Sequence, residues 1–355
     1  MLARAAAPFA AIVVIGSLVG IQHAPAATPS TIFTRVQDAP VLQPSRGWYD
    51  DYMLSSPSVV RVGGVLYMVY TGFCQKPAGY TPLLPPARTC PGDAGIFLLG
   101  ATSTDGVHWS KGSGPIIRPI PGERWMKQAL TEAELVAGPD GWFYLFFTGN
   151  GPGSSRAIGV ARSRAPFGPW DIDPRPILHG VPSALSGRHK VLAPDVRIEP
   201  DRDRVLMWFN GTNQLEFGWD VYAATSTWPL RTADGWSTWR FADRGQRAVV
   251  GPYNAGSGDP TVVVDHGLYH MFFTCGSPKF NGPSGICHAT SMDGLHFELA
   301  PNLDALLPRS RRWDANLETP FVMPAATGGY MMWYLGYGRY GYRGASIGVA
   351  QAPEL

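Results

Sequence analysis

The stretch 259–274 reads DPTVVVDHGLYHMFFT, in which a short apolar strand begins beside a Pro and leads to an aromatic strand. The stretch 57–72 reads PSVVRVGGVLYMVYTG and has the same pattern. Three further copies occupy 132–149, 193–211 and 319–336. Pro57, Ala133, Pro194, Pro260 and Pro320 mark the copies, at intervals of 76, 61, 66 and 60 residues. Five β-hairpin units at this period predict a radial array of sheets, an all-β five-bladed β-propeller.

The remaining strands of each repeat follow its aromatic strand. A small-residue strand such as Leu98–Ser103 or Ile286–Ser291 comes third, and short apolar segments predict the outer strands at Pro115–Ile117, Pro176–Leu178, Ala248–Val250 and Leu306–Pro308. The fifth repeat ends after its third strand, at Leu355. We therefore expect the N-terminal segment Ala39–Leu42 to pair with Ser346–Ala350 as its outer strand, which closes the ring and removes an exposed edge. An open solenoid is the alternative.

Two turns share the pattern Ser-X-Asp-Gly-X-His-aromatic, at 103–109 and 291–297. Asp-Gly favours a tight turn because Gly adopts positive φ without strain. These segments resemble the Asp-box turns of sialidases, and we interpret them as structural elements on the outer side of their blades.

The N-terminus predicts a secretory signal peptide over residues 1–26, with the propeller domain over 27–355. Arg4 precedes the small and apolar run Ala5–Val19, and Ala24-Pro25-Ala26 supplies small residues for cleavage. An uncleaved anchor is the alternative, although Pro8 and Gly16 interrupt the run. Cleavage predicts a secreted or periplasmic protein.

The composition excludes several classes of partner. The formal net charge is +2 and falls to +1 without Arg4, which is too weak to indicate nucleic acid or an acidic membrane as partner. No other apolar run reaches the roughly 18 residues of a membrane-spanning helix. We expect one large domain, a monomer that is free of the membrane after cleavage.

Four cysteines lie in two local pairs on matching hairpins. Cys74 and Cys90 bracket the loop after the first aromatic strand, and Cys275 and Cys287 bracket the equivalent loop of the fourth repeat. In an exported chain this arrangement favours disulfides Cys74–Cys90 and Cys275–Cys287. Zinc ligation is the alternative, but the spacing contains no CxxC element.

Acidic side chains gather where the inner strands begin, and every repeat contributes at least one. They are Asp50, Asp51, Glu132, Glu134, Asp195, Asp259 and Glu318. Because the inner strands of a propeller converge on its axis, these carboxylates are expected at one mouth of the central channel. The alternative is that they cap turns or pair with Arg197, Arg311 or Arg312.

Aromatic residues flank the same mouth. Trp48, Trp125 and Trp313 precede inner strands, and Phe217, Trp219, Phe280, Tyr337, Tyr340 and Tyr342 follow aromatic strands. Such rings either stack on sugars or pack the blades. Carboxylates that converge beside aromatic rings suit glycoside hydrolysis, in which one acid protonates the leaving oxygen while another group activates water or attacks the anomeric carbon. A third charge nearby raises the pKa of the acid by repulsion.

In these features the chain resembles the family 43 glycoside hydrolases, of the arabinanase and xylosidase type, and their relatives in families 32, 62 and 130. That family presents an Asp-Pro base, a Trp-Ala-Pro-Asp phrase, an Asp-Pro modulator and a Glu acid near a Pro. Leu192–Asp195 is similar to the second phrase, Gly258–Pro260 to the third and Glu318–Pro320 to the fourth. Glu132 stands where the family has its Asp base, and the leading blade Asp50–Ser103 matches the family's last blade in a circular sense.

The resemblance implies roles for three residues. In this register Glu132 is the general base, Asp259 orients the acid and raises its pKa, and Glu318 is the general acid of an inverting reaction. A competing register uses Asp51, Asp195 and Asp259, which leaves no Glu for the acid. The residues expected to contact the substrate are Asp51, Asp195, Trp48, Trp125, Arg188, His189, Trp313 and Tyr337.

Three functions remain open from the sequence, each with a carbohydrate as partner. The first is an exported hydrolase of an arabinan- or xylan-like polysaccharide or oligosaccharide. The second is a family 130-like phosphorylase or transferase, for which Arg188, Lys190, Arg339 and Arg343 would bind phosphate. The third is a non-catalytic sugar-binding propeller. No cofactor is required, and although some relatives hold a cation such as calcium in the channel, no motif here specifies a metal.

Overall fold

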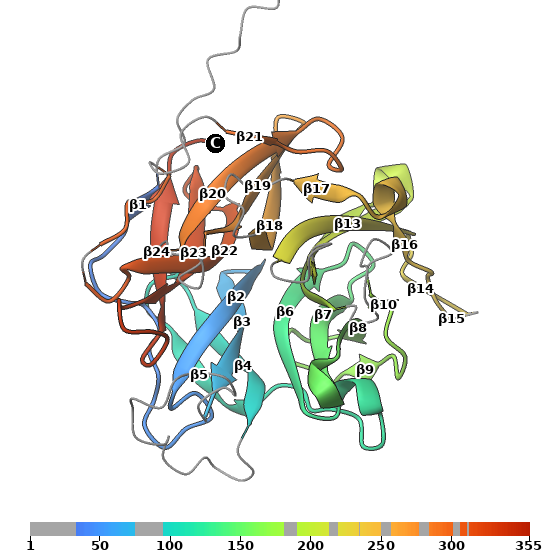
Figure 1. Cartoon of the computed structure of the whole chain (residues 1–355), viewed down its shortest axis with the longest axis horizontal. Helices are drawn as coiled ribbons and strands as arrows, with labels where there is room; N and C mark the ends of the chain where they lie inside the picture. Colours follow the sequence, from blue (N-terminus) through green and yellow to red (C-terminus); the bar gives the residue numbers. More distant parts are fainter. Residues whose placement is uncertain are drawn as a thin grey trace, which may run out of the picture.

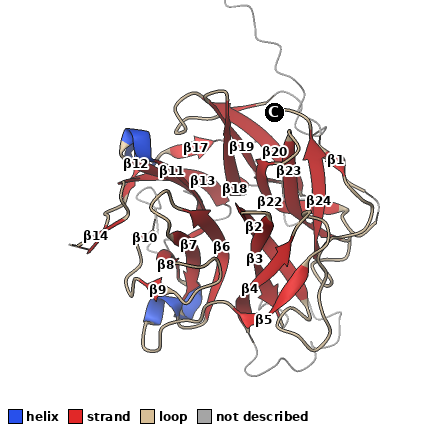
Figure 2. Cartoon of the chain, turned by 180° about the vertical axis from the view of Figure 1, so that it is seen from behind, coloured by secondary structure: helices blue, strands red, loops and turns tan. Residues whose placement is uncertain are grey.

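The computed structural model describes residues 33–74, 95–180, 190–212, 219–233, 235–249, 257–276, 284–300, 306–310 and 312–355. In these ranges the chain forms five antiparallel sheets of four or five strands and one separate two-stranded hairpin. The sheets surround a central axis, with β2, β6, β18 and β22 among the strands nearest to it (Figure 1). Seen from behind, strands dominate and the described helices are short (Figure 2). The prediction of an all-β five-bladed β-propeller is confirmed.

Each blade runs from an inner strand to an outer one. Blade one contains β2 (Met53–Val62), β3 (Val65–Phe73), β4 (Ile96–Ser103) and β5 (Ser110–Pro115). Blade two contains β6 (Ala129–Ala137), β7 (Phe143–Asn150), β8 (Arg156–Ser163), β9 (Asp171–Ile172) and β10 (Leu178–His179). Blade three contains β11 (Val191–Glu199), β12 (Arg204–Thr212), β13 (Trp219–Thr227), β16 (Arg240–Phe241) and β17 (Arg247–Val249).

Blade four contains β18 (Ser257–Asp265), β19 (Leu268–Cys275), β20 (Gly285–Ser291) and β21 (Glu298–Leu299). Blade five contains β22 (Asn316–Pro324), β23 (Tyr330–Tyr337), β24 (Ser346–Ala352) and the N-terminal β1 (Thr34–Arg35). The separate hairpin is β14 (Arg231–Thr232) with β15 (Gly235–Trp236). Four short 3₁₀ helices are described, η1 (Arg124–Met126), η2 (Pro152–Ser154), η3 (Pro200–Arg202) and η4 (Ala242–Gly245).

The N-terminal segment closes the ring, as predicted. Leu42 forms an isolated bridge with Ile347, and the regular strand β1 lies earlier, where Thr34 pairs with Gln351 and Arg35 with Ala350. This segment covers the edge of β24, which would otherwise expose its unpaired backbone groups.

The core lies between neighbouring blades. Tyr144 and Phe146 of β7 pack toward blade three, whereas Leu145 and Phe147 pack toward blade one. Because successive side chains of a strand point to opposite faces, both faces of the aromatic strands are buried. This burial explains why these strands are almost continuously apolar in the sequence.

Two of the predicted outer strands were wrong. In blade one the outer strand is Ser110–Pro115, which ends where the prediction begins, and in blade four it is Glu298–Leu299. Leu306 and Leu307 are buried instead in the apolar core between blades four and five. The true outer strands are largely polar and exposed, so they carry no apolar pattern.

The two Asp-box turns have the expected structural role. In the first, Asp105 Oδ1 accepts the backbone N–H groups of Val107 and His108 at 2.8 Å, and Trp333 of the preceding blade donates its indole N–H to Gly106 O at 2.9 Å. In the second, Trp208 donates to Gly294 O at 2.7 Å. Each turn thereby joins its blade to the blade before it.

The disulfide Cys275–Cys287 is confirmed and joins β19 to β20, with the Cα atoms 5.8 Å apart. Cys74 is disulfide-bonded, and its predicted partner Cys90 lies outside the described residues. The signal peptide over 1–26, Arg188, His189, Phe217 and Phe280 also lie outside them. Within the described ranges no helix is long and apolar enough to cross a membrane.

Candidate active site

Every inner strand carries a β-bulge at the same place. The bulges fall between Ser55 and Ser58, Thr131 and Glu134, Leu192 and Asp195, Gly258 and Thr261, and Glu318 and Phe321. The residue with positive φ in each bulge is Ser56, Glu132, Ala193, Asp259 or Thr319, with φ of 46–50°. Non-glycine residues seldom adopt this conformation, and a bulge re-aims the side chains around it.

A ring of hydrogen bonds between blades holds the bulges in place. The backbone N–H of each bulge residue donates to a polar side chain of the preceding blade. The pairs are Glu132 with Thr71 (2.8 Å), Ala193 with Thr148 (3.0 Å), Asp259 with Asn210 (2.6 Å), Thr319 with Thr274 (2.9 Å) and Ser56 with Thr319 (3.2 Å). These bonds satisfy the amides that the bulges remove from the strand ladders, so neighbouring blades share one rigid rim.

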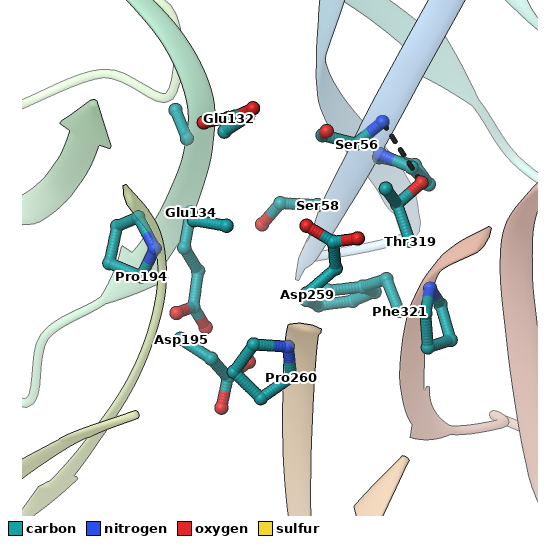
Figure 3. Close-up of a pocket in the computed structure, with 14 residues that line it drawn as sticks. Ser56, Ser58, Glu132, Glu134, Pro194, Asp195, Asp259, Pro260, Thr319 and Phe321 are labelled. Atoms are coloured by element: carbon teal, nitrogen blue, oxygen red, sulfur yellow. Dashed lines mark hydrogen bonds between the residues drawn. The ribbon is translucent and has the colours of Figure 1, made fainter. Parts of the chain in front are cut away.

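The bulges line one cavity (Figure 3). Four carboxylates line it, from Glu132, Glu134, Asp195 and Asp259, together with the bulge prolines and Phe321. The cavity therefore concentrates acidic groups where the five inner strands meet.

Asp259 is the centre of the acidic group. Its carboxylate accepts Asn210 Nδ2–H at 3.1 Å and the Thr274 hydroxyl at 3.0 Å. Burial first, and then the charges of Glu132 and Glu318, raise the pKa of Asp259 to about 7 against the lowering effect of these two hydrogen bonds. The charges of both predicted partners therefore act on Asp259, although only Glu132 and Asp259 line the cavity itself.

Glu132 presents a free acceptor to this site. Among the described residues its nearest cation is Arg156, whose guanidinium Nη1 lies 3.8 Å from Glu132 Oε1 and whose Cζ lies 6.0 Å from the ring centroid of Trp219. Glu132 Oε2 is buried and has no hydrogen-bond partner among the described residues. A buried carboxylate oxygen without a donor is costly, so a water or a sugar hydroxyl is its natural partner.

Glu318 lies at the start of its bulge and is held by tyrosine hydroxyl groups. Tyr337 donates to Glu318 Oε1 at 2.6 Å, and Tyr342 lies 2.9 Å from both carboxylate oxygens. Glu318 and Tyr337 belong to the paired strands β22 and β23, whereas Tyr342 comes from the loop before β24.

Glu134 and Asp195 form a second, deeper carboxylate pair. Figure 3 shows the Glu134 side chain turned toward Asp195, away from Glu132. Glu134 accepts the backbone N–H of Val196, and Asp195 accepts that of Val262 at 3.0 Å. Burial raises the pKa of both carboxyl groups, and the charge of Asp195 raises that of Glu134 further.

The same position in other blades shows that this pair has a structural role. Ser58 accepts the N–H of Leu135 at 3.0 Å, and Thr261 accepts that of Val322 at 3.4 Å. Glu134 and Asp195 thus take the place of neutral interblade acceptors, so we assign Asp195 to the floor of the cavity.

Blades one and five contribute no carboxylate to the lining of the cavity, contrary to the expectation that every repeat would; in blade five Glu318 directly precedes the lining residue Thr319. Asp51 accepts Gly47 N–H at 3.0 Å in the preceding turn and does not line the cavity. Asp50 is fully buried with Lys111 and Tyr70. The bulge positions of blade one hold Ser56 and Ser58, so Asp51 of the competing register, like Glu318 of the first one, is not among the residues that line the cavity.

The tryptophans predicted to bind substrate pack the blades. Trp125 lies over Gly149 and Gly159 and donates to Pro174 O at 2.8 Å, and Trp313 lies over Gly336 and Gly348. A Cβ on any of these glycines would meet an indole atom at 2.3–2.8 Å, so the rings occupy the space of missing side chains. Trp48 contacts Tyr49 edge to face, with the ring centroids 5.2 Å apart, and none of the three lines the cavity.

No group of three or more His, Cys, Asp or Glu side chains gathers as a metal site in the described part of the chain. Sequence reasoning missed Arg156 and the polar side chains of the rim. A signal for the rim was present, since three aromatic strands contain Thr-Gly or Asn-Gly and a fourth contains Thr-Cys at this position, Thr71, Thr148, Asn210 and Thr274.

Comparisons with known proteins place this fold. No protein-family model and no curated protein matches the sequence. A thermostable family-43 glycoside hydrolase superposes with a TM-score of 0.60 at 14% identity, over 84% of this chain and 89% of its own. The chain has the fold of the family 43 glycoside hydrolases.

Two further solved structures show the same similarity. A glycosyl hydrolase from Bacteroides ovatus has a TM-score of 0.65 at 14% identity, over 90% of this chain and 93% of its own. An α-L-arabinofuranosidase from Clostridium thermocellum has a TM-score of 0.57 at 16% identity, over 84% of this chain and 89% of its own. The resemblance predicted from the sequence is therefore confirmed at the level of the fold.

Proposed function

We propose that this protein is a glycoside hydrolase that acts on an arabinan- or xylan-like polysaccharide or oligosaccharide outside the cytoplasm. The observation that supports this most strongly is the position of Glu132 and Asp259 on the lining of one cavity, with Glu318 next to the lining residue Thr319 and its charge acting on Asp259. Carboxyl groups that face one another at a cavity are the machinery of glycosidic bond cleavage.

In the proposed reaction Glu318 donates a proton to the glycosidic oxygen as the bond to the anomeric carbon breaks. Glu132 accepts a proton from a water molecule, whose oxygen attacks the anomeric carbon from the opposite face. The product then has inverted configuration. After the reaction Glu318 is a carboxylate and Glu132 is protonated. The unpartnered Oε2 of Glu132 supports its role because it is free to accept a hydrogen bond from that water.

Asp259 acts on the acid through its charge. Two negative charges side by side disfavour each other, so above about pH 7, where Asp259 is ionised, its charge favours the protonated form of Glu318. Asn210 and Thr274 fix the Asp259 carboxylate in place for this purpose.

The substrate class and the location rest on separate observations. The family-43 hydrolase and the arabinofuranosidase share this fold, which favours a substrate rich in furanose or xylose. The disulfide Cys275–Cys287 and the predicted signal peptide favour export, because disulfides persist in oxidising compartments.

An activity screen of the mature protein over arabinan, xylan and aryl glycosides tests the proposal. We expect turnover of at least one substrate, with product of inverted anomeric configuration by proton NMR, and loss of turnover in Glu318→Gln with retained substrate binding. Binding without turnover in the parent protein would identify a sugar-binding propeller instead. Turnover that requires inorganic phosphate would identify a phosphorylase.

A further inference from the structure

The two tyrosines around Glu318 form a compact unit. Tyr337 is 2% exposed, and its ring stacks on that of Tyr342 with centroids 4.1 Å apart and an interplanar angle of 27°. The Tyr337 hydroxyl also lies 2.9 Å from the hydroxyl of the fully buried Ser284. The Ser284 hydroxyl therefore holds the Tyr337 hydroxyl in addition to Glu318, and Tyr337 needs no substrate to keep its position.

A tyrosine hydroxyl beside a carboxylate acts as a hydrogen-bond donor. Burial and the adjacent charge of Glu318 raise the pKa of Tyr337, so its proton stays in place throughout the pH range of a working enzyme. Donation to a charged acceptor is stronger than donation to a neutral one, and it favours the ionised form of the acceptor. The stacked rings add rigidity because each tyrosine has only two rotatable side-chain bonds.

We propose that Tyr337 and Tyr342 are positioning residues for Glu318, which hold its carboxylate in one orientation beside the cavity residue Thr319 and favour its ionised form. Tyr337 was expected to contact substrate; its burial and its bond to Glu318 favour this indirect role instead. The inference rests on the proposed function only for its kinetic readout, since the effect on the Glu318 carboxyl exists with or without turnover.

The two tyrosines oppose the effect of Asp259. Ionised Asp259 favours the protonated form of Glu318, whereas the hydroxyl donors favour the carboxylate that remains after proton transfer. With these two opposing effects, Glu318 can be either protonated or ionised, as a general acid requires. Removal of either tyrosine hydroxyl therefore favours the protonated form of Glu318.

The test uses Tyr337→Phe and Tyr342→Phe, with Tyr334→Phe as the matched control. Tyr334 is on the same strand and donates to buried Asp314 at 3.2 Å, away from the cavity. We expect kcat to fall roughly 10-fold in each test variant through loss of orientation. The high-pH limb of the kcat profile should move up by about one pH unit, because the acid stays protonated longer. The control should lose thermal stability without moving the limb.

Direct titration of the Glu318 carboxyl by ¹³C NMR, assigned by its absence in Glu318→Gln, gives a readout that needs no activity. An upward shift of this titration in both test variants supports the inference even if every glycoside in the screen fails. An unmoved titration and an unmoved pH limb, with losses that follow thermal stability alone as in Tyr334→Phe, would overturn it. Unchanged kcat in both variants would overturn it equally.

Discussion

Three acidic residues at the repeated bulge positions account for the proposed chemistry of the site. The positive-φ position of the bulge holds Ser56 and Ala193 in two blades but Glu132 and Asp259 in two others. The position before it holds Glu318 in blade five. Because every blade has the same bulge, Glu132 and Asp259 line the cavity, and Glu318 lies next to it, without a structural change of their own. At this scale the bulge fixes the direction of the side chain, and the residue type at that position determines the chemistry.

Arg156 is expected to contribute to turnover because it is the nearest cation to Glu132. Arg156→Met keeps most of the apolar stem of the side chain and removes its charge and donors. We expect kcat/KM to fall about 10-fold, the usual effect of losing one oriented polar contact in a site. Steady-state kinetics on the best substrate of the screen provides the measurement.

Arg162→Met is the matched control, since Arg162 lies on the same strand but packs on Trp142, 4.3 Å from its ring centroid. A loss of activity equal to that of Arg156→Met would show that charge on β8 matters only for stability.

The deeper pair predicts an unusual dependence of stability on pH. Burial raises the pKa of Glu134 and of Asp195 in the folded state, so the folded protein binds these protons more tightly than the unfolded chain. The stabilisation by these bound protons is complete below the pKa range of carboxyl groups in the unfolded chain. It is lost as pH rises through the pKa values of Glu134 and Asp195 in the folded protein. Glu134→Gln keeps an acceptor for Val196 N–H and removes one ionisation. We expect its melting temperature to exceed that of the parent by roughly 2–4 °C at pH 9 and to match it at pH 5.

Glu199→Gln serves as the control for this experiment. Burial opposes the ionisation of Glu199, but hydrogen bonds from Tyr269 and Arg204 outweigh it and lower its pKa. Its substitution should therefore destabilise the protein at pH 9. A lower melting temperature for Glu134→Gln than for the parent at pH 9 would show that Glu134 and Asp195 are both ionised in the folded protein and stabilise it in that form.

At the scale of elements, the sequence predicted the strands whose two faces are buried. The inner and aromatic strands of all five blades were correctly placed because burial on both faces leaves a continuous apolar run, as in Leu66–Tyr70. The outer strands Ser110–Pro115 and Glu298–Leu299 were missed because they are short and mostly polar. The bulges were marked by Pro in four blades, but their positive φ is a backbone property that no residue pattern displays.

The disulfide of blade four stands next to a residue that holds Asp259. Cys275 follows Thr274, whose hydroxyl donates to Asp259 Oδ2. The double variant Cys275→Ser, Cys287→Ser should lose roughly 2–4 kcal/mol of unfolding free energy, since the bond closes a loop of 12 residues. We also expect a larger fractional loss of kcat than in Tyr334→Phe, as measured on the folded fraction. Unchanged kcat would show that β19 keeps its position without the bond.

At the scale of the whole molecule, the site exists only when the ring is closed. Glu132 and Asp259 are separated by 127 residues and Asp259 and Glu318 by 59. The sequence could predict these three as a group because propeller geometry brings inner strands to one axis. It could not predict that Trp125 and Trp313 fill the space beside glycines, or that Asp195 pairs with Glu134. Those outcomes depend on contacts between strands that no local pattern records.

Closure itself depends on a short N-terminal segment, which is the last feature that can be tested. Phe33 is 1% exposed and contacts Phe272 edge to face with centroids 5.6 Å apart, and Arg35 Nε pairs with Asp314 at 2.6 Å. Phe33→Ala should lose about 3–5 kcal/mol, the usual cost of removing a buried aromatic ring. A chain that begins at residue 43 should lose more, because it also exposes the edge of β24 and leaves Asp314 without its cation.

The comparison is between mature chains that begin at residues 33 and 43, studied by thermal melting and size-exclusion chromatography. We expect the shorter chain to melt at least 10 °C lower or to self-associate through the exposed edge. Addition of a peptide with the sequence of residues 33–42 should restore part of the loss, since strand addition to a free edge is a known mode of recognition. A shorter chain with the same melting temperature and a monomeric profile would show that blade five is complete with three strands. The ring would then be held by the direct contacts between blades five and one, such as the hydrogen bonds of Ser56 N–H to Thr319 Oγ1 and of Trp333 to Gly106 O.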